Sequence, residues 1–265
     1  MGALSQWRRL YRETAVSPAS RRALVTGGSA GLGAAIVRWL LAREYAVVLL
    51  DRDPPQSVDG QVDFIQCDLT SRDALDLVVP GLVGAGPFDL VVLNSGIDVT
   101  GRFEDMDAQA HIDLLRVNAE APMVIAARLM EANAFTPGAA MVFVSSMSHF
   151  TGYPGAASYA ASQDALAIYA RSMRKVARSK GVTITVAFPG PLRTSHAEIH
   201  TPPGADASKR MEPDLAASLI MADALAGRKN SIPGARNRLF AAAGRVFPRL
   251  VTALMRQLIY QRLGR

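Results

Sequence analysis

The sequence predicts a single α/β domain built on a three-layer, doubly wound parallel sheet. Short apolar segments typical of strands alternate with segments typical of helices across residues 21–230, and the composition does not change along them. The chain has 265 residues, of which 49% are hydrophobic and 20% charged, so it has enough apolar material for one large core.

The expected elements follow one another in a regular order. Strands are expected at residues 22–26, 45–50, 63–67, 90–93, 139–145 and 182–188, with a short last strand at 231–234. Helices are expected at 34–42, 72–79, 104–133 (as one helix or two), 156–179 and 213–227. Thr70 or Ser71 is expected to cap the helix that begins at residue 72. The prolines and glycines of residues 189–213 predict a loop.

The positive charge lies at the two ends of the chain. Residues 1–22 carry five arginines and one acid, and residues 224–265 carry nine basic residues and no acid. Subtracting +4 and +9 from the net charge of +6 leaves −7 for the body between them. This distribution argues against a nucleic-acid-binding surface and predicts a basic N-terminal arm, residues 1–20, with a separate role.

Residues 231–265 predict a basic amphipathic helical extension. Apolar residues recur there at helical spacing between arginines. Such helices can cover a substrate pocket, join a partner subunit or make peripheral contact with an anionic membrane, and packing on protein is the commoner outcome. Apolar runs of about 18 residues are absent, so we expect no membrane-spanning helix.

Cys67 is the only cysteine of the chain. A single cysteine excludes an intramolecular disulfide and favours a reducing compartment, so we expect a cytoplasmic protein. His196 and His200 have no partners at metal-ligand spacing, so we expect no metal site.

A glycine-rich turn joins the first expected strand to the helix that follows it. Gly27, Gly31 and Gly33 permit positive φ angles and close approach of the backbone to a ligand. The same turn contains Ser29 and Leu32, and the helix N-terminus there offers unpaired N–H groups to a pyrophosphate. Strand, turn and helix in this order predict a dinucleotide-binding site.

Asp51 ends the second expected strand, eighteen residues beyond Gly33. A carboxylate there can accept hydrogen bonds from the ribose hydroxyls of adenosine and would repel a 2′-phosphate. We therefore expect NAD rather than NADP as the cofactor. Arg52 follows immediately and would favour the phosphate if Asp51 turned away, so NADP stays open.

Polar and small residues follow the third and fourth expected strands. Asp68, with Leu69 beside it, is placed either to contact the adenine or to cap the next helix. Asn94 and Gly96 follow the fourth strand, where small residues let a flat cofactor lie against the backbone.

Asn118 lies in a segment that is expected to be helical. Its neighbours at core-facing positions are Val117, Val124, Ala127 and Met130. A buried asparagine needs hydrogen-bond partners. Asn118 is therefore either a structural link between neighbouring strands or a group that positions a water in a proton path.

These residues together resemble the short-chain dehydrogenase/reductase family over about residues 22–225. The matching positions stand in the family's order: Thr26, Gly27, Gly31, Gly33, Asp51, Asp68, Asn94, Gly96, Asn118, Ser146, Tyr159, Pro189, Gly190 and Thr194. The resemblance implies a Rossmann-type fold, a nicotinamide cofactor and hydride transfer between that cofactor and an alcohol or ketone. We also expect a homodimer or homotetramer.

Ser146 and Tyr159 carry the chemistry that the resemblance implies. Reduction of a ketone places negative charge on its oxygen, so a hydroxyl and a phenol that both hydrogen-bond to that oxygen stabilise the transition state. Ser146 is expected to orient the substrate and Tyr159 to transfer the proton. Pro189 and Gly190 are expected beside the nicotinamide and Thr194 at its carboxamide. Two further residues, His149 and Tyr153, are expected to line the substrate side.

Gln163 departs from the family pattern. The family has a lysine four residues after the tyrosine, one helical turn along the same face. That lysine hydrogen-bonds the nicotinamide ribose, and its charge favours the tyrosinate, whose unperturbed pKa is about 10. Gln163 can make the hydrogen bond but carries no charge. The chain is therefore an enzyme that tolerates the loss, a catalytically impaired nucleotide-binding regulatory or scaffold protein, or a lysine-to-glutamine variant.

Overall fold

The computed structural model describes residues 21–56, 60–194, 210–258 and 260. The predicted basic arm, residues 1–20, lies outside the described residues, as do His196, His200 and the last residues of the C-terminal extension.

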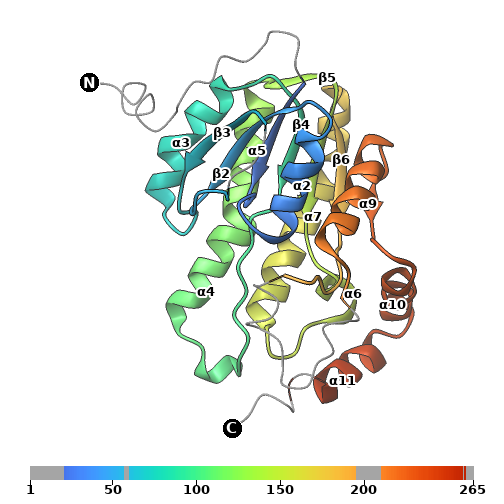
Figure 1. Ribbon diagram of the computed structural model, residues 1–265. Coiled ribbons are helices and arrows are strands. Elements are labelled where there is room, and N and C mark those ends of the chain that lie inside the picture. The colour runs from blue at the N-terminus through green and yellow to red at the C-terminus, as the bar shows by residue number, and fades with distance from the viewer. Residues whose placement is uncertain (1–20, 57–59, 195–209, 259, 261–265) are drawn as a thin grey trace.

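The centre of the molecule is a sheet of seven parallel strands in the order β3-β2-β1-β4-β5-β6-β7 (Figure 1). The strands are β1 (Arg22–Thr26), β2 (Ala46–Asp51), β3 (Val62–Gln66), β4 (Phe88–Leu93), β5 (Phe135–Val144), β6 (Thr183–Ala187) and β7 (Asn230–Ser231). The chain runs outward from β1 to β3 and then returns to β4 on the other side of β1. This order confirms the predicted doubly wound sheet and places its switch point between β1 and β4.

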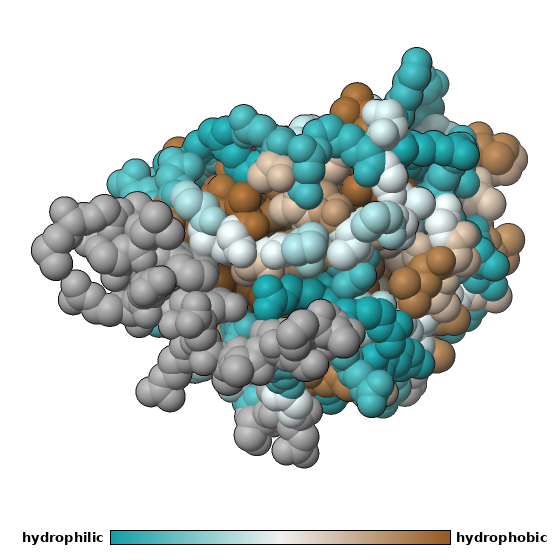
Figure 2. Space-filling view, turned by 90° about the horizontal axis from the view of Figure 1, so that it is seen from above, coloured by the Kyte–Doolittle hydropathy of each residue, from teal (hydrophilic) through white to brown (hydrophobic). Residues whose placement is uncertain are grey.

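Helices cover both faces of the sheet and complete the three predicted layers (Figure 1). Helices α2 (Gly31–Leu41) and α9 (Pro213–Leu225) cover one face with a core that includes Ile36 and Ile220. Helices α3 (Arg72–Gly84), α5 (Ala121–Glu131) and α7 (Ala157–Ser179) cover the other. Seen from above, hydrophilic residues lie along the upper edge of the view and apolar residues show in the middle of the face (Figure 2). Strands buried on both sides explain why their sequences are almost continuously apolar.

Some element bounds differ from the expected ones for clear physical reasons. Helix α2 begins at Gly31 instead of residue 34, because the end of the glycine turn already forms its first turn. Helix α3 passes through Pro80 and ends at Gly84 instead of residue 79. The proline costs one backbone hydrogen bond, but the helix beyond it buries Leu82, which is 1% exposed.

The segment expected as one helix or two is divided by a π turn. It contains a short 3₁₀ turn, η1 (Phe103–Asp105), then α4 (Ala108–Leu115), the π turn η2 (Arg116–Glu120) and α5. Val117 and Met130 are buried as expected, but Ala127 is exposed. A π turn takes one residue more than an α turn, so it rotates α5 and brings other residues to the core, including Ile125 and Leu129.

The C-terminal extension forms α10 (Ala235–Val246) and α11 (Pro248–Leu258), which both contact the short helix α6 (Ser148–Thr151). Gly244 allows close packing, because a Cβ atom there would lie 2.1 Å from the carbonyl oxygen of Phe150. The hydroxyl of Thr252 donates a hydrogen bond to the carbonyl of Thr151 at 3.2 Å. The extension therefore packs on its own domain, beyond the carboxyl end of β5. Within the described part of the chain, no helix is long and apolar enough to cross a membrane.

Candidate active site

The glycine turn sits at the switch point of the sheet and requires its glycines. Gly27 and Gly31 have φ angles of +67° and +54°, which side chains rarely allow. A Cβ atom at Gly33 would lie 1.9 Å from the carbonyl oxygen of Gly27. Ala30, the N-cap residue of α2, has no side-chain group that could cap the helix. The N–H groups of the first turn, including that of Leu32, therefore remain available to an anion.

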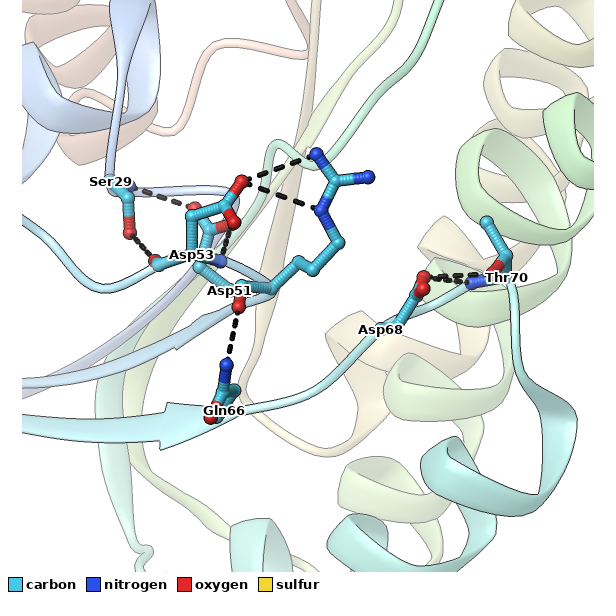
Figure 3. A network of polar contacts seen from close by, with 7 residues as sticks. Ser29, Asp51, Asp53, Gln66, Asp68 and Thr70 are labelled. Carbon is cyan, nitrogen blue, oxygen red and sulfur yellow. Dashed lines mark hydrogen bonds and ion pairs between the residues drawn. The ribbon is translucent and has the colours of Figure 1, made fainter.

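Asp51 turns back toward this glycine turn from the end of β2 (Figure 3). Its carboxylate accepts a hydrogen bond from the backbone N–H of Ser29 at 2.9 Å and a longer one from that of Asp53 at 3.3 Å. Arg52 pairs with Asp53, with 3.2 Å between the guanidinium nitrogen and the carboxylate oxygen. Asp51, and not Arg52, thus lies across the glycine turn.

Asp68 organises the turn that leads into α3 (Figure 3). Its Oδ1 accepts hydrogen bonds from the N–H of Thr70 at 2.9 Å and from the hydroxyl of Thr70 at 2.8 Å. Ser71 is the capping residue, since its Oγ accepts a hydrogen bond from the N–H of Ala74. Of the two roles open to Asp68, the structure shows a local one that prepares the cap. Leu69 is buried beside it, at 8% exposure.

Asn94 links β4 to the glycine turn. Its side-chain amide donates to the carbonyls of Gly27 at 2.9 Å and Thr26 at 3.2 Å. The hydroxyl of Thr26 in turn accepts from the backbone N–H groups of Asn94 and Ser95. Asn94 therefore stabilises the conformation of the glycine turn from the end of β4.

Asn118 is fully buried in the π turn and joins three segments. Its Oδ1 accepts from the N–H of Ile97 at 2.8 Å, and its Nδ2 donates to the carbonyl of Ile97 at 2.9 Å and to the hydroxyl of Ser162 at 3.0 Å. Ser162 then donates to the carbonyl of Tyr159. The side chain of Asn118 thus links the segment after β4 to the helix that carries Tyr159, and not two neighbouring strands. The contribution of Ser162 was not predicted from the sequence.

Tyr159 and Ser146 are brought together at the carboxyl end of β5. Burial raises the pKa of the Tyr159 phenol to about 12, although its interaction with the hydroxyl of Ser146 lowers it. Asp98 and then Tyr153 raise it further through their charge. The phenol is therefore protonated at neutral pH. Its surroundings stabilise the tyrosinate less than water does.

Gln163 is buried, and its amide lies next to the backbone of Gly96. The side chain is 4% exposed, and a Cβ atom at Gly96 would lie 3.8 Å from its Nε2 and 3.7 Å from Oδ1 of Asn118. The Oε1 of Gln163 has no hydrogen-bond partner among the described residues. A buried acceptor of this kind is rare in a folded chain and marks a place where a bound group is expected.

Asp98 is a site residue that we did not predict from the sequence. It lies near Tyr159 and Tyr153 and raises the pKa of both phenols. Its position two residues beyond Gly96, at the carboxyl end of a central strand, was the available signal.

The two residues expected to line the substrate side have different surroundings. The ring of Tyr153 meets the ring of Tyr159 edge to face, with 6.1 Å between their centroids. His149 stacks on Phe188 and contacts the carboxylate of Asp164 at 2.6 Å.

The loop after β6 lies close to the glycine turn. A Cβ atom at Gly31 would lie 3.3 Å from the side chain of Thr194. Pro189 accepts a hydrogen bond from the N–H of Met147 at 3.3 Å. A Cβ atom at Gly190 would lie 2.6 Å from the side chain of Asn237, so α10 packs directly on this loop. In the described ranges, no cluster of three His, Cys, Asp or Glu side chains could hold a metal ion.

The sequence is similar to known proteins of one family. Residues 21–202 match the family model "short chain dehydrogenase". An uncharacterized oxidoreductase of Myxococcus xanthus is 29% identical over 180 residues, which cover 64% of this chain and 71% of that protein. The 3-oxoacyl-[acyl-carrier-protein] reductase MabA of Mycobacterium tuberculosis is 30% identical over 181 residues, which cover 66% of this chain and 70% of that protein.

Solved structures share the fold. A short chain dehydrogenase from Burkholderia cenocepacia in complex with NADP has a TM-score of 0.74 at 22% identity, covering 89% of this chain and 97% of its own. A 4-hydroxyisoleucine dehydrogenase complexed with NADH has a TM-score of 0.69 at 20% identity, covering 80% of this chain and 96% of its own. The fold, the site and the family match lead to one conclusion: the chain belongs to the short chain dehydrogenase family.

Proposed function

We propose that the chain is an oxidoreductase that transfers hydride between NAD and a small-molecule alcohol or ketone. The observation that carries the proposal is the meeting of Tyr159 and Ser146 at the carboxyl end of the sheet, one helical turn from the buried Gln163. A substrate oxygen held by both hydroxyl groups is stabilised as it gains negative charge. The phenol of Tyr159 supplies the proton in reduction and accepts it in oxidation.

The residues around the switch point fit a nicotinamide dinucleotide. The open N-terminus of α2 suits a pyrophosphate, and the unpartnered Oε1 of Gln163 suits a ribose hydroxyl. When bound, this cofactor supplies a carbon that gives or takes hydride. The residues proposed to hold it are Gly27, Ser29, Gly31, Leu32, Gly33, Asp51, Asp68, Leu69, Asn94, Gly96, Tyr159, Gln163, Pro189, Gly190 and Thr194.

Asp51 favours NAD over NADP. Its carboxylate is held across the glycine turn by the N–H of Ser29, where it would repel a 2′-phosphate. Arg52, the residue that could attract that phosphate, is paired with Asp53. Three solved relatives are complexed with NADP or NADPH and one with NADH, so the proposal of NAD is supported only by the residues of this chain.

The raised pKa of Tyr159 favours reduction over oxidation at neutral pH. Reduction needs a protonated phenol, which a pKa of about 12 provides. Oxidation needs the phenolate, which burial and Asp98 disfavour and which Gln163 cannot stabilise by charge. Asn118 assists by holding the backbone of Tyr159 in place through Ser162.

We also propose that the protein is cytoplasmic and forms a homodimer or homotetramer. Cys67 is buried, and burial raises the pKa of its thiol to about 11. We therefore expect an unreactive core thiol, which is compatible with a reducing compartment. Exposed apolar side chains on the contacting helices α4 and α7, among them Leu115 and Ile168, offer a surface for a second copy.

A screen of alcohols and ketones by nicotinamide absorbance, together with calorimetry of NAD and NADP binding, tests the function. We expect NAD binding and turnover of at least one substrate class, with Tyr159→Phe abolishing turnover and retaining NAD binding. Binding of NAD without turnover at any pH would support the regulatory or scaffold alternative. Failure to bind either nucleotide would overturn the proposal.

A further inference from the structure

Large apolar side chains are exposed on the outward surface of α10 and α11. Five large apolar side chains on it are 44–74% exposed: Leu239, Val246, Phe247, Leu250 and Leu254. Single exposed apolar residues are ordinary, but five within residues 239–254 of two contacting helices mark a surface that meets something other than water. We call these five residues the C-terminal apolar surface.

The geometry of α11 explains why this surface faces outward. Leu250 and Leu254 are four residues apart, so they lie on one side of α11, and Phe247 immediately precedes this helix. Val251, on another side, is only 6% exposed, and Thr252 hydrogen-bonds to α6. Helix α11 is therefore docked on the domain by one side and presents its other apolar side chains to solvent.

Positive charge surrounds the C-terminal apolar surface. Arg245, Arg249 and Arg256 are interleaved with its residues along the two helices. The sequence contains no acidic residue from position 224 to position 265, so no carboxylate of this segment offsets them. Arg245 lies over the ring of Phe150 in α6, with 4.6 Å between guanidinium carbon and ring centroid.

Exposed apolar side chains together with arginines indicate which kind of partner this surface binds. A second copy of the chain placed on the same surface would bring arginines against arginines, which is unfavourable. A nucleic acid would match the positive charge, but its phosphate backbone would make no favourable contact with five exposed apolar side chains. An anionic lipid bilayer matches both, because apolar side chains enter the headgroup boundary and arginines meet the phosphates.

We propose that α10 and α11 dock this protein on the surface of an anionic lipid bilayer, with both helices lying in the interface. Both helices contact α6, which begins two residues after Ser146, and Figure 1 shows the three helices at the same end of the molecule. Docking would therefore turn the carboxyl end of β5 toward the lipid. The proposal does not depend on the oxidoreductase activity.

Flotation of the full-length protein with vesicles tests the proposal. One set of vesicles is pure phosphatidylcholine and the other contains phosphatidylcholine with phosphatidylglycerol. We expect at least about tenfold stronger partitioning to the anionic vesicles, weakening as salt is added. Equal partitioning to both sets, or none to either, would overturn the proposal.

Two pairs of substitutions separate the apolar and charged contributions. Arg249→Gln with Arg256→Gln is expected to weaken partitioning by about 30-fold, on the order of 1 kcal/mol for each arginine. Leu250→Ser with Leu254→Ser is expected to weaken it by about tenfold or more. Circular dichroism and NAD binding check that the variants are folded.

Matched controls substitute leucines and arginines that lie outside the C-terminal apolar surface. Leu215→Ser with Leu225→Ser changes two leucines on α9 that are each 53% exposed, and Arg171→Gln with Arg178→Gln changes two exposed arginines on α7. Both controls are expected to float like the unmodified protein. Equal losses in test and control pairs would contradict docking by this surface. Dissociation of an oligomer by the Leu250 and Leu254 changes would assign the surface to a second copy instead.

Discussion

Tyr159 and Gln163 stand one turn apart on α7. In the proposed reaction, the rate at neutral pH depends on the absence of a positive charge at Gln163. The phenol has a pKa of about 12, because burial outweighs the help of Ser146. A cation beside it would lower that pKa, but the amide of Gln163 carries no charge. The nearby Asp98 acts in the opposite direction.

The rate of alcohol oxidation is therefore expected to rise with pH. Oxidation requires the phenolate, whose fraction increases about tenfold for each pH unit below the pKa of about 12. Steady-state oxidation rates between about pH 7 and pH 10 should follow this slope, whereas reduction should stay nearly flat, because the phenol remains protonated. A plateau of the oxidation rate near neutral pH would show that the phenolate is stabilised by a group other than those described.

Gln163→Lys is expected to move the oxidation profile to lower pH by about 1–3 units, because an ammonium beside the phenol favours the phenolate. At neutral pH this corresponds to a gain of about tenfold or more. Gln163→Met is the matched control: it has no charge, so it should leave the profile in place while weakening cofactor binding. Coincident profiles for the glutamine and lysine forms, with NAD binding intact, would refute the electrostatic argument.

Asp51→Asn is expected to raise kcat/KM with NADPH by about tenfold or more and to lower it with NADH. The change removes a carboxylate whose repulsion of a phosphate at short range is on the order of 4 kcal/mol. Asp53→Asn is the control, because it removes the partner of Arg52 but leaves Asp51 in place. If Asp53→Asn changed the preference and Asp51→Asn did not, Arg52 would be the deciding residue.

Single residues were predictable where one backbone geometry demands one residue type. Gly27 and Gly33 are of this kind, since a side chain at either would meet the backbone of another residue. The role of Asp68 was open in the sequence, because a carboxylate before a helix suits a turn and a ligand equally well. Asp98 escaped prediction because its influence comes from folding next to Tyr159, sixty-one residues later in the chain.

At the scale of elements, the π turn around Asn118 is the least predictable feature and one of the most consequential. Hydrophobic spacing assumes an uninterrupted helix, so it placed Ala127 in the core. Asn118 uses the wider turn to reach Ile97 and Ser162 together. The strands were easier to predict, because a parallel sheet buried on both faces gives continuous apolar runs.

Asn118→Ala is expected to destabilise the protein by about 1–3 kcal/mol, because it leaves the N–H and carbonyl of the partly buried Ile97 without their partner. Urea unfolding followed by circular dichroism measures this change. Gln109→Ala, which removes an exposed hydrogen bond on α4, is the control and should change stability by less than about 0.5 kcal/mol. A similar effect of both substitutions would mean that the link through Asn118 contributes little.

At the scale of the whole molecule, alternating strands and helices predicted the three layers and the doubly wound parallel sheet. The position of α10 and α11 did not follow in the same way, because an amphipathic basic helix fits the chain's own domain, a partner or a membrane. Gly190 and Gly244 show the physical basis of the placement found: both lie at close approaches that leave no room for a side chain. Such complementarity between distant segments cannot be read from local spacing.

The contacting helices α4 and α7 carry exposed apolar residues that are expected to mediate self-association. Ile112 and Leu115 on α4 are 44% and 48% exposed, and Ile168 on α7 is 56% exposed. Ile168→Arg should therefore reduce the molar mass measured by light scattering to that of a smaller assembly, because a buried cation without a partner is costly. Leu225→Arg on α9 changes a similarly exposed residue and should leave the mass unchanged. A monomer in the unmodified protein, or an unchanged mass in Ile168→Arg, would exclude this face as the contact between copies.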